Sequence, residues 1–160
     1  MVEEKKKCIA VVRIRGVIGA SREIKDTLKM LNLKRNYHAV LIDNRPSYLG
    51  MLNKVQNYVT WGEPSEEIVA LMIKKRGRLN GDKKLTDEYA KKLGYKSLEE
   101  LAKAIYEGKI DYNKLPGIKP FFRLHPPSKG FKGKVKKSFG TGGETGYRGE
   151  AINELLERMI

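Results

Sequence analysis

Three apolar runs alternate with two helical patterns in the first 64 residues, and this order constrains the fold more than any other feature. The first run, Cys8 to Arg15, carries apolar residues at odd and even positions until its two arginines, which is typical of a strand covered on both faces. Tyr37 to Ile42 and Tyr58 to Trp61 are the other two runs. The order strand-helix-strand-helix-strand predicts a small αβ sandwich with its helices on one face of the sheet.

The two intervening helices are predicted from caps and from the spacing of their apolar residues. Ser21 is a candidate N-cap, and the apolar residues Leu28 and Leu31 follow at helical spacing. Ser47 is the candidate cap of the second helix. From these patterns we predict that the core of this unit includes Leu28, Val40, Leu52 and Val55.

The rest of the chain divides into two further parts. Residues 65–118 predict a helical extension, with helices after Ser65, over Thr86–Leu93 and over Ser97–Glu107. Residues 119–160 predict a strand, Lys119 to His125, then a basic Gly/Lys loop over 126–149, and a helix that packs back on the core. We therefore expect an α+β protein in three parts, 1–64, 65–118 and 119–160.

The charge of the chain points to a polyanionic partner. Lys and Arg number 33 against 19 Asp and Glu, a net charge of +14. Residues 119–149 hold eight basic residues against one acidic residue, Glu144. Phe131, Phe139 and Tyr147 lie among these cations, where they could stack on unpaired bases or pack the loop onto the protein. The competing interpretation of this segment is a solvated lysine loop.

The sequence gives no support to several classes of function. No apolar run approaches the roughly 20 residues of a membrane-spanning helix. Cys8 is the single cysteine, best interpreted as a small buried apolar side chain, and His38 and His125 are too far apart for metal-ligand spacing. No catalytic triad pattern, cofactor motif or export signal is visible, so we expect an intracellular protein that is not an enzyme and has no cofactor and no small-molecule substrate.

A Gly-x-x-Gly spacing, Gly16 to Gly19, precedes the first helix. Backbone amides at a helix N-terminus attract phosphate, and the loop is distantly similar to those of KH domains and, with Arg22, of acylphosphatases. A KH loop joins two helices, however, whereas a strand precedes this one. A tight strand-to-helix turn explains the spacing at least as well.

Two stretches, Ile9-Ala-Val-Val-Arg-Ile-Arg-Gly-Val-Ile-Gly19 and Leu49-Gly-Met-Leu-Asn-Lys-Val-Gln-Asn-Tyr-Val59, resemble the large-subunit ribosomal proteins of the L-thirty family. Arg123-Leu-His-Pro-Pro-Ser-Lys-Gly-Phe131 is similar to the longer archaeal branch, whose eukaryotic relatives are named L-seven. The resemblance implies a ferredoxin-like core, a structural role in the large subunit, and 23S rRNA as ligand, near 5S rRNA and neighbouring ribosomal proteins. Bacterial members commonly carry a basic residue where this chain has Leu49.

We accordingly expect a cytoplasmic, ribosome-associated rRNA-binding protein, with a free-standing RNA-binding or RNA-processing protein as the alternative and an acylphosphatase-like hydrolase as a distant third. The candidate RNA-binding residues are the cations of the loops and strand ends, together with one histidine: Arg13, Arg15, Arg22, Arg45, Lys54, Arg123, His125, Lys129, Lys132, Lys134, Lys136, Lys137 and Arg148.

Arg123 has two competing interpretations. Alternation along its strand places it on the face opposite Phe122, where a guanidinium could pair with phosphate or stack on a base. It could instead pair with an acidic residue of the 65–118 segment, such as Glu99 or Asp111.

Overall fold

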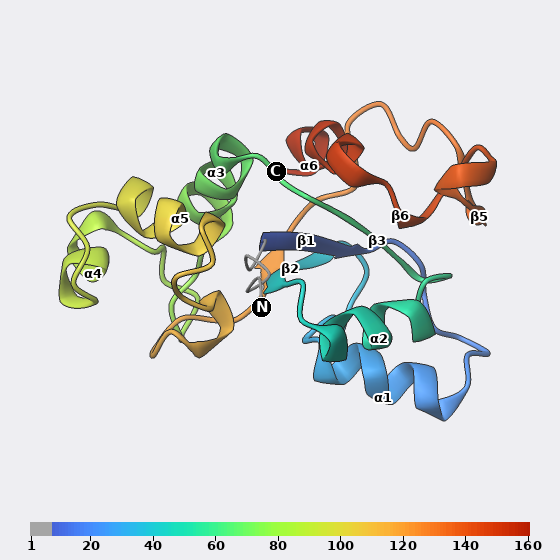
Figure 1. The fold of residues 1–160 in the computed structure, drawn as a ribbon, viewed down its shortest axis with the longest axis horizontal. Coiled ribbons are helices and arrows are strands. Elements are labelled where there is room, and N and C mark those ends of the chain that lie inside the picture. Colours follow the sequence, from blue (N-terminus) through green and yellow to red (C-terminus); the bar gives the residue numbers. More distant parts are fainter. Residues whose placement is uncertain (1–7) are drawn as a thin grey trace, which may run out of the picture.

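The computed structural model describes residues 8–160, which form six strands and six α-helices in one mixed fold (Figure 1). The strands are β1 (Cys8–Arg13), β2 (His38–Asp43), β3 (Val59–Gly62), β4 (Phe122–Arg123), β5 (Lys134–Ser138) and β6 (Gly143–Tyr147). The helices are α1 (Arg22–Met30), α2 (Pro46–Lys54), α3 (Glu66–Arg76), α4 (Asp87–Lys92), α5 (Leu98–Tyr106) and α6 (Ile152–Met159).

All six strands belong to one sheet, in the order β4-β2-β1-β3-β6-β5. Strand β1 lies near the centre and pairs antiparallel with both β2 and β3. Strand β4 adds antiparallel to β2 at one edge, through His38–Arg123 and Ala39–Phe122. Strand β6 adds parallel to β3, and β5 forms the opposite edge. The two ends of the 119–149 segment therefore lie at opposite sides of the sheet.

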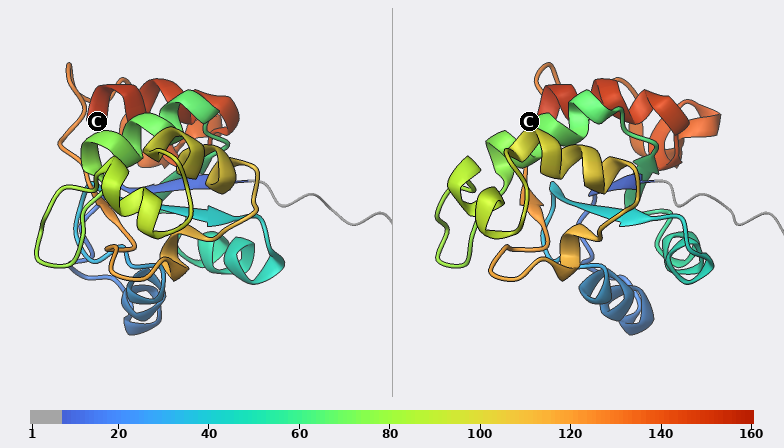
Figure 2. Two further views of the ribbon diagram at one scale, coloured as in Figure 1. Left: turned by 90° about the vertical axis from the view of Figure 1, so that its left-hand side faces the viewer. Right: turned by 60° about the vertical axis from the view of Figure 1, so that its left-hand side comes forward.

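Helices cover both faces of this sheet (Figures 1 and 2). Helices α1 and α2 lie on one face, and α3, α5 and α6 lie on the other. Alternate residues of β1 divide between the two layers, with Ile9 and Val11 in the α1–α2 layer and Ala10 and Val12 in the other. This alternation follows from the two-residue period of a strand, and it explains why the β1 sequence is apolar at every position before Arg13.

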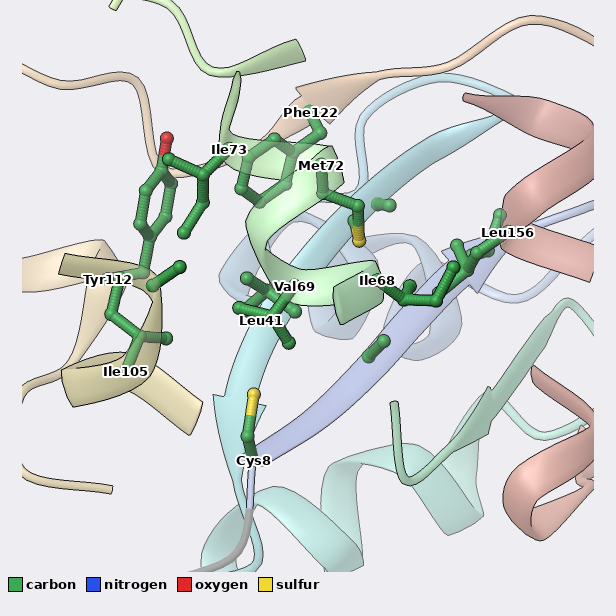
Figure 3. Close-up of a cluster of buried hydrophobic side chains, with 14 of the residues drawn as sticks. Cys8, Leu41, Ile68, Val69, Met72, Ile73, Ile105, Tyr112, Phe122 and Leu156 are labelled. Atoms are coloured by element: carbon green, nitrogen blue, oxygen red, sulfur yellow. The ribbon is translucent and has the colours of Figure 1, made fainter. Parts of the chain in front are cut away.

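The larger core draws on all three parts of the chain. Figure 3 shows Cys8 and Leu41 of the sheet facing Val69 of α3, with Ile105, Tyr112 and Phe122 around them. Leu156 of α6 joins the same cluster. Burial raises the pKa of the Cys8 thiol to about 12, as expected for a small buried side chain without reactivity.

Most sequence predictions for the fold are confirmed. The ferredoxin-like strand-helix-strand-helix-strand core is present, and the four predicted core residues are buried: Leu28, Val40, Leu52 and Val55. Ser21 caps α1 by accepting a hydrogen bond from the backbone N–H of Ile24, and Ser65, Thr86 and Ser97 cap their helices in the same way.

Three local predictions are wrong. Helix α2 begins at Pro46 with Arg45 as its N-cap residue, because the fixed φ of proline suits the first helical position, so Ser47 lies inside the helix. The predicted strand over 119–125 pairs only at Phe122 and Arg123. The segment 126–149, predicted as a loop, contains β5 and β6.

Candidate nucleic-acid interface

Strand β5 presents a row of lysines at the edge of the sheet. Lys134, Lys136 and Lys137 are exposed, and within the described chain no carboxylate lies within ion-pairing distance of any of them. We name these three residues the β5 lysines. Lysine on an exposed edge strand also discourages edge-to-edge pairing with other chains. Unpaired ammonium groups in a row are nonetheless the arrangement that can neutralise successive phosphates.

The loop before β5 carries two more of the predicted cations. Lys129 is exposed and adopts a positive φ of 68° in the turn that precedes Gly130. Lys132 pairs with Glu154 of α6, and the hydrogen bond from its ammonium group lowers the pKa of that carboxyl. Arg158 of α6 donates to the carbonyl of Gly130 at 2.6 Å. The loop is therefore attached to α6, and Lys129 remains available on its surface.

Arg148, at the end of β6, lies inside the protein. Its side chain is 4% exposed, and it pairs with the equally buried Glu144 at 2.6 Å. Its Nε donates to the Thr60 hydroxyl at 2.7 Å, and Thr60 donates to the carbonyl of Gly146. These bonds join β6 to β3. Because a buried guanidinium that already holds a carboxylate is not open to a phosphate, we leave Arg148 out of the interface.

Arg13 and Arg45 also have structural partners. Arg13 is 6% exposed, donates to the carbonyls of Arg15 and Leu33, and has its pKa lowered by burial. Arg45 forms a bidentate pair with Asp43, which raises its pKa, and reaches Asp111 at 3.1 Å. The Arg45–Asp111 pair connects the start of α2 to the 65–118 extension. Both arginines hold the fold together, so neither is in the interface that we propose.

The α1 side of the molecule carries three further predicted cations. Arg15 donates to the carbonyl of Asn57 and lies 5.3 Å from the ring centroid of Tyr58. The Arg22 side chain is 94% exposed, with Asp26 3.8 Å away. Lys54 pairs with Glu23 at 2.6 Å and lowers the pKa of that carboxyl. Arg22 therefore points to solvent rather than into a catalytic pocket.

The Gly16–Gly19 spacing forms a tight turn between β1 and α1. The Ala20 N–H donates to the Val17 carbonyl at 3.0 Å, and Gly19 takes a φ of +82°, which a glycine adopts without strain. The amide of Ile24 in the first turn of α1 is already bound by the Ser21 cap. This geometry agrees with the tight-turn interpretation.

A second basic region lies at the β4 edge. Arg123 pairs with Asp82 at 3.2 Å and lies 5.8 Å from the ring centroid of Phe121. The competing interpretation named an acidic partner in the 65–118 segment, and Asp82 is such a partner, although neither Glu99 nor Asp111 is. The same carboxylate accepts from Lys119 at 2.5 Å, the main reason that its pKa is lowered. His125 lies beyond β4, with its Nδ1 2.6 Å from the Pro126 carbonyl oxygen.

His38 is buried beside this edge and stacks on Phe121 at 4.8 Å between ring centroids. Burial, followed by the positive charges of Arg123, Arg35 and Arg13, lowers the pKa of His38 to about 4. The imidazole is therefore neutral at physiological pH. Arg35, which the sequence interpretation did not single out, belongs to this cationic group; its signal was the Lys34-Arg35 pair just before the strand that contains His38.

The structure separates the predicted cations into regions. Arg123 lies at the β4 edge and the β5 lysines at the other edge of the sheet, with Arg15, Arg22 and Lys54 on the α1 side. Among residues 8–160, no group of three metal-ligating side chains comes together, and no helix is long and apolar enough to cross a bilayer. Such a surface suits many phosphate contacts.

Comparisons with known proteins identify the family to which this chain belongs. A sequence profile of the family described as Ribosomal protein L30p/L7e matches residues 9–59, which span β1 to the start of β3. The protein named "Large ribosomal subunit protein uL30" from Methanopyrus kandleri is 52% identical over 92% of this chain and 100% of its own length. Proteins of that name from Archaeoglobus fulgidus (53% identical over 94% of this chain and 98% of its own length) and Nanoarchaeum equitans (49% over 94% and 97%) are similar throughout. With half of its residues shared over nearly its whole length, this chain belongs to the Ribosomal protein L30p/L7e family.

Proposed function

We propose that this protein is a structural constituent of an archaeal large ribosomal subunit and binds rRNA through its exposed cations. The observation that carries the proposal is the near-full-length identity to archaeal proteins named for the large subunit. The net charge of +14 fits a phosphate-rich partner. A non-enzymatic role is in keeping with a family of ribosomal proteins.

The β5 lysines and Lys129 are the first part of the proposed interface. Among residues 8–160, no carboxylate lies within ion-pairing distance of these four ammonium groups, so a phosphate can bind them without breaking an ion pair of that part of the chain. Phe139, which follows β5, is 39% exposed with the Arg148 guanidinium 4.9 Å from its ring centroid. One face of this ring could stack on an unpaired base of 23S rRNA.

The β4 edge, the α1 side and Lys132 of the loop before β5 form the rest of the interface. Arg123, Lys132 and Lys54 each hold an exposed carboxylate, and exposed pairs are worth only about 0–1 kcal/mol. A phosphate can therefore displace the carboxylate at small cost. Arg15, Arg22, Arg35 and His125 complete the set. Contacts to 23S rRNA, closeness to 5S rRNA and neighbouring ribosomal proteins all belong to this proposal.

The test is retention on the particle. We expect the tagged protein to sediment with large subunits through a high-salt wash and to remain with their rRNA. Substitution of the three β5 lysines by alanine should lower the salt concentration at which the protein dissociates, whereas Lys91→Ala/Lys92→Ala on α4 serves as the charge control. A protein that binds RNA but leaves the subunit at moderate salt would instead favour the free-standing accessory role.

A further inference from the structure

One groove on this basic protein has an acidic and aromatic lining. It lies on the α1–α2 face of the sheet, because Ile9 and Trp61 of its lining belong to the core cluster on that face, and it has a volume of about 410 Å³. Its lining includes Ile9, Leu49, Trp61, Glu63 and Tyr147. We name it the β3–β6 groove. Its lining contains none of the cations of the three regions described above.

Two aromatic rings form its wall. Trp61 of β3 and Tyr147 of β6 are register partners in a parallel pair, so their side chains leave the same face of the sheet. Their ring centroids lie 6.4 Å apart, with the planes tilted by 49°. Trp61 is nearly buried at 7% exposure, whereas Tyr147 is 56% exposed and Leu49 is 38% exposed. The groove thus offers an aromatic surface to solvent.

The orientation of the Tyr147 ring is fixed by a carboxylate. Its hydroxyl lies 2.7 and 2.8 Å from the two carboxylate oxygens of Glu63 and donates to them. This hydrogen bond, with burial and the negative charges of Glu63 and Glu150, raises the pKa of Tyr147. Two acidic groups therefore act on one exposed ring.

Positive charge is absent from the lining of this groove within residues 8–160, although the chain as a whole is strongly basic. A nucleic-acid strand would bring phosphates toward Glu63 with no cation in the lining to neutralise them. A cation, by contrast, would be attracted to the Glu63 carboxylate. Arginine is the best match, because its planar guanidinium stacks on aromatic rings and pairs with carboxylates at the same time.

We propose that the β3–β6 groove binds an arginine-bearing segment of a neighbouring protein in the large subunit. The guanidinium stacks on the exposed face of Tyr147 and pairs with Glu63, while the aliphatic part of the segment packs on Leu49 and Ile9. The identity of the partner as another protein of the same particle rests on the proposed function. Cation binding by the groove does not, and it can be measured on the isolated protein.

Trp61 supplies the measurement, because it is the single tryptophan of the chain and it lines the groove. We expect acetyl-tetraarginine amide to change its fluorescence saturably and tetrauridylate to leave it unchanged. Glu63→Gln should weaken peptide binding about threefold to fivefold, through loss of the ion pair. Glu88→Gln removes the same charge from the exposed surface of α4 and should leave the affinity unchanged.

A second variant separates the ring from its hydroxyl. Tyr147→Phe keeps the stacking surface and should bind the peptide within about twofold of the unmodified protein, whereas Tyr147→Ser should bind several-fold more weakly. Equal affinity in Glu63→Gln and the unmodified protein, or a larger response to tetrauridylate than to the peptide, would overturn the proposal.

The assembled particle tests the partner itself. A photoreactive benzoylphenylalanine at position 49, on the rim of the groove, should crosslink in purified large subunits to an arginine-containing stretch of another protein. A crosslink to rRNA, or to a segment without arginine, would contradict the proposal. Failure of the unmodified protein to sediment with large subunits would contradict the proposed function instead, and the fluorescence titration would be unaffected by that outcome.

Discussion

Strands β5 and β6 come from the same Gly/Lys-rich stretch and lie next to each other in the sheet, yet they have opposite surroundings. Every residue of β6 from Gly143 to Gly146 is buried, whereas β5 is exposed along almost all of its length. The two strands also differ in the ion pairing of the cations beside them. The cation that follows β6, Arg148, has a buried carboxylate partner and joins two strands. The β5 lysines have no carboxylate partner within residues 8–160. The paired Arg148 therefore stabilises this part of the fold, whereas the β5 lysines are available to bind a ligand.

Amide hydrogen exchange should show the largest contrast between the two strands. We expect β6 amides to exchange only on global unfolding, because β6 pairs with β3 and its surroundings are closed. The amides of β5, at the edge, should exchange through local opening at a small fraction of that free energy. Equal protection of the β5 and β6 amides in the free protein would contradict this difference between the two strands.

Sequence reasoning located β1, β2 and β3 because each is a short apolar run ended by charged or turn-forming residues. It could not locate β6 in this way, since Gly143-Glu-Thr-Gly-Tyr147 contains no aliphatic residue. Polar bonds at this strand are made by Arg148, which donates to Thr60 of β3 and to Glu144 of β6. One signal was present. Glu144 is the only acidic residue of 119–149, and an arginine follows four residues later. For the same reason, composition could not tell the buried Arg148 from the exposed lysines near it.

Loss of the buried ion pair should be the most damaging substitution. Arg148→Ala leaves the Glu144 carboxylate buried without its partner, which costs about 3–5 kcal/mol of the free energy of unfolding. Urea denaturation measures this loss. The double variant Glu144→Gln/Arg148→Met removes both charges and should recover much of the stability. A single variant as stable as the unmodified protein would show that the pair does not hold β6 in place.

The close approach of β5 and β6 predicts a smaller effect at a glycine. A Cβ on Gly143 would lie 1.9 Å from the carbonyl oxygen of Lys137, so the two strands must move apart in Gly143→Ala. We expect a loss of about 1–3 kcal/mol, in the range of overpacked sites. Gly140→Ala is the matched control, because a Cβ there meets nothing within 4 Å. Equal stability of the two variants would contradict the close strand contact.

Removal of the β5 lysines should separate stability from binding. Lys134→Ala/Lys136→Ala/Lys137→Ala should change the free energy of unfolding by no more than about 0.5 kcal/mol, as for surface sites. If all three ammonium groups contact phosphates, the slope of log affinity for rRNA against log salt should flatten by about 2–3. Affinity measured at several salt concentrations tests this. An unchanged slope would mean that the lysines only protect the edge of the sheet.

The opposite edge provides the smallest expected change in stability. Arg123 is half-exposed and its pair with Asp82 lies in solvent, so Arg123→Ala should lower stability by only a few tenths of a kcal/mol. The same substitution should reduce affinity for rRNA, because the guanidinium on Phe121 can leave Asp82 for a phosphate. Asp82→Asn is the informative companion: it frees Arg123 and Lys119 together and should strengthen RNA binding. A large fall in melting temperature with unchanged RNA binding in Arg123→Ala would assign Arg123 to the fold, alongside Arg13, Arg45 and Arg148.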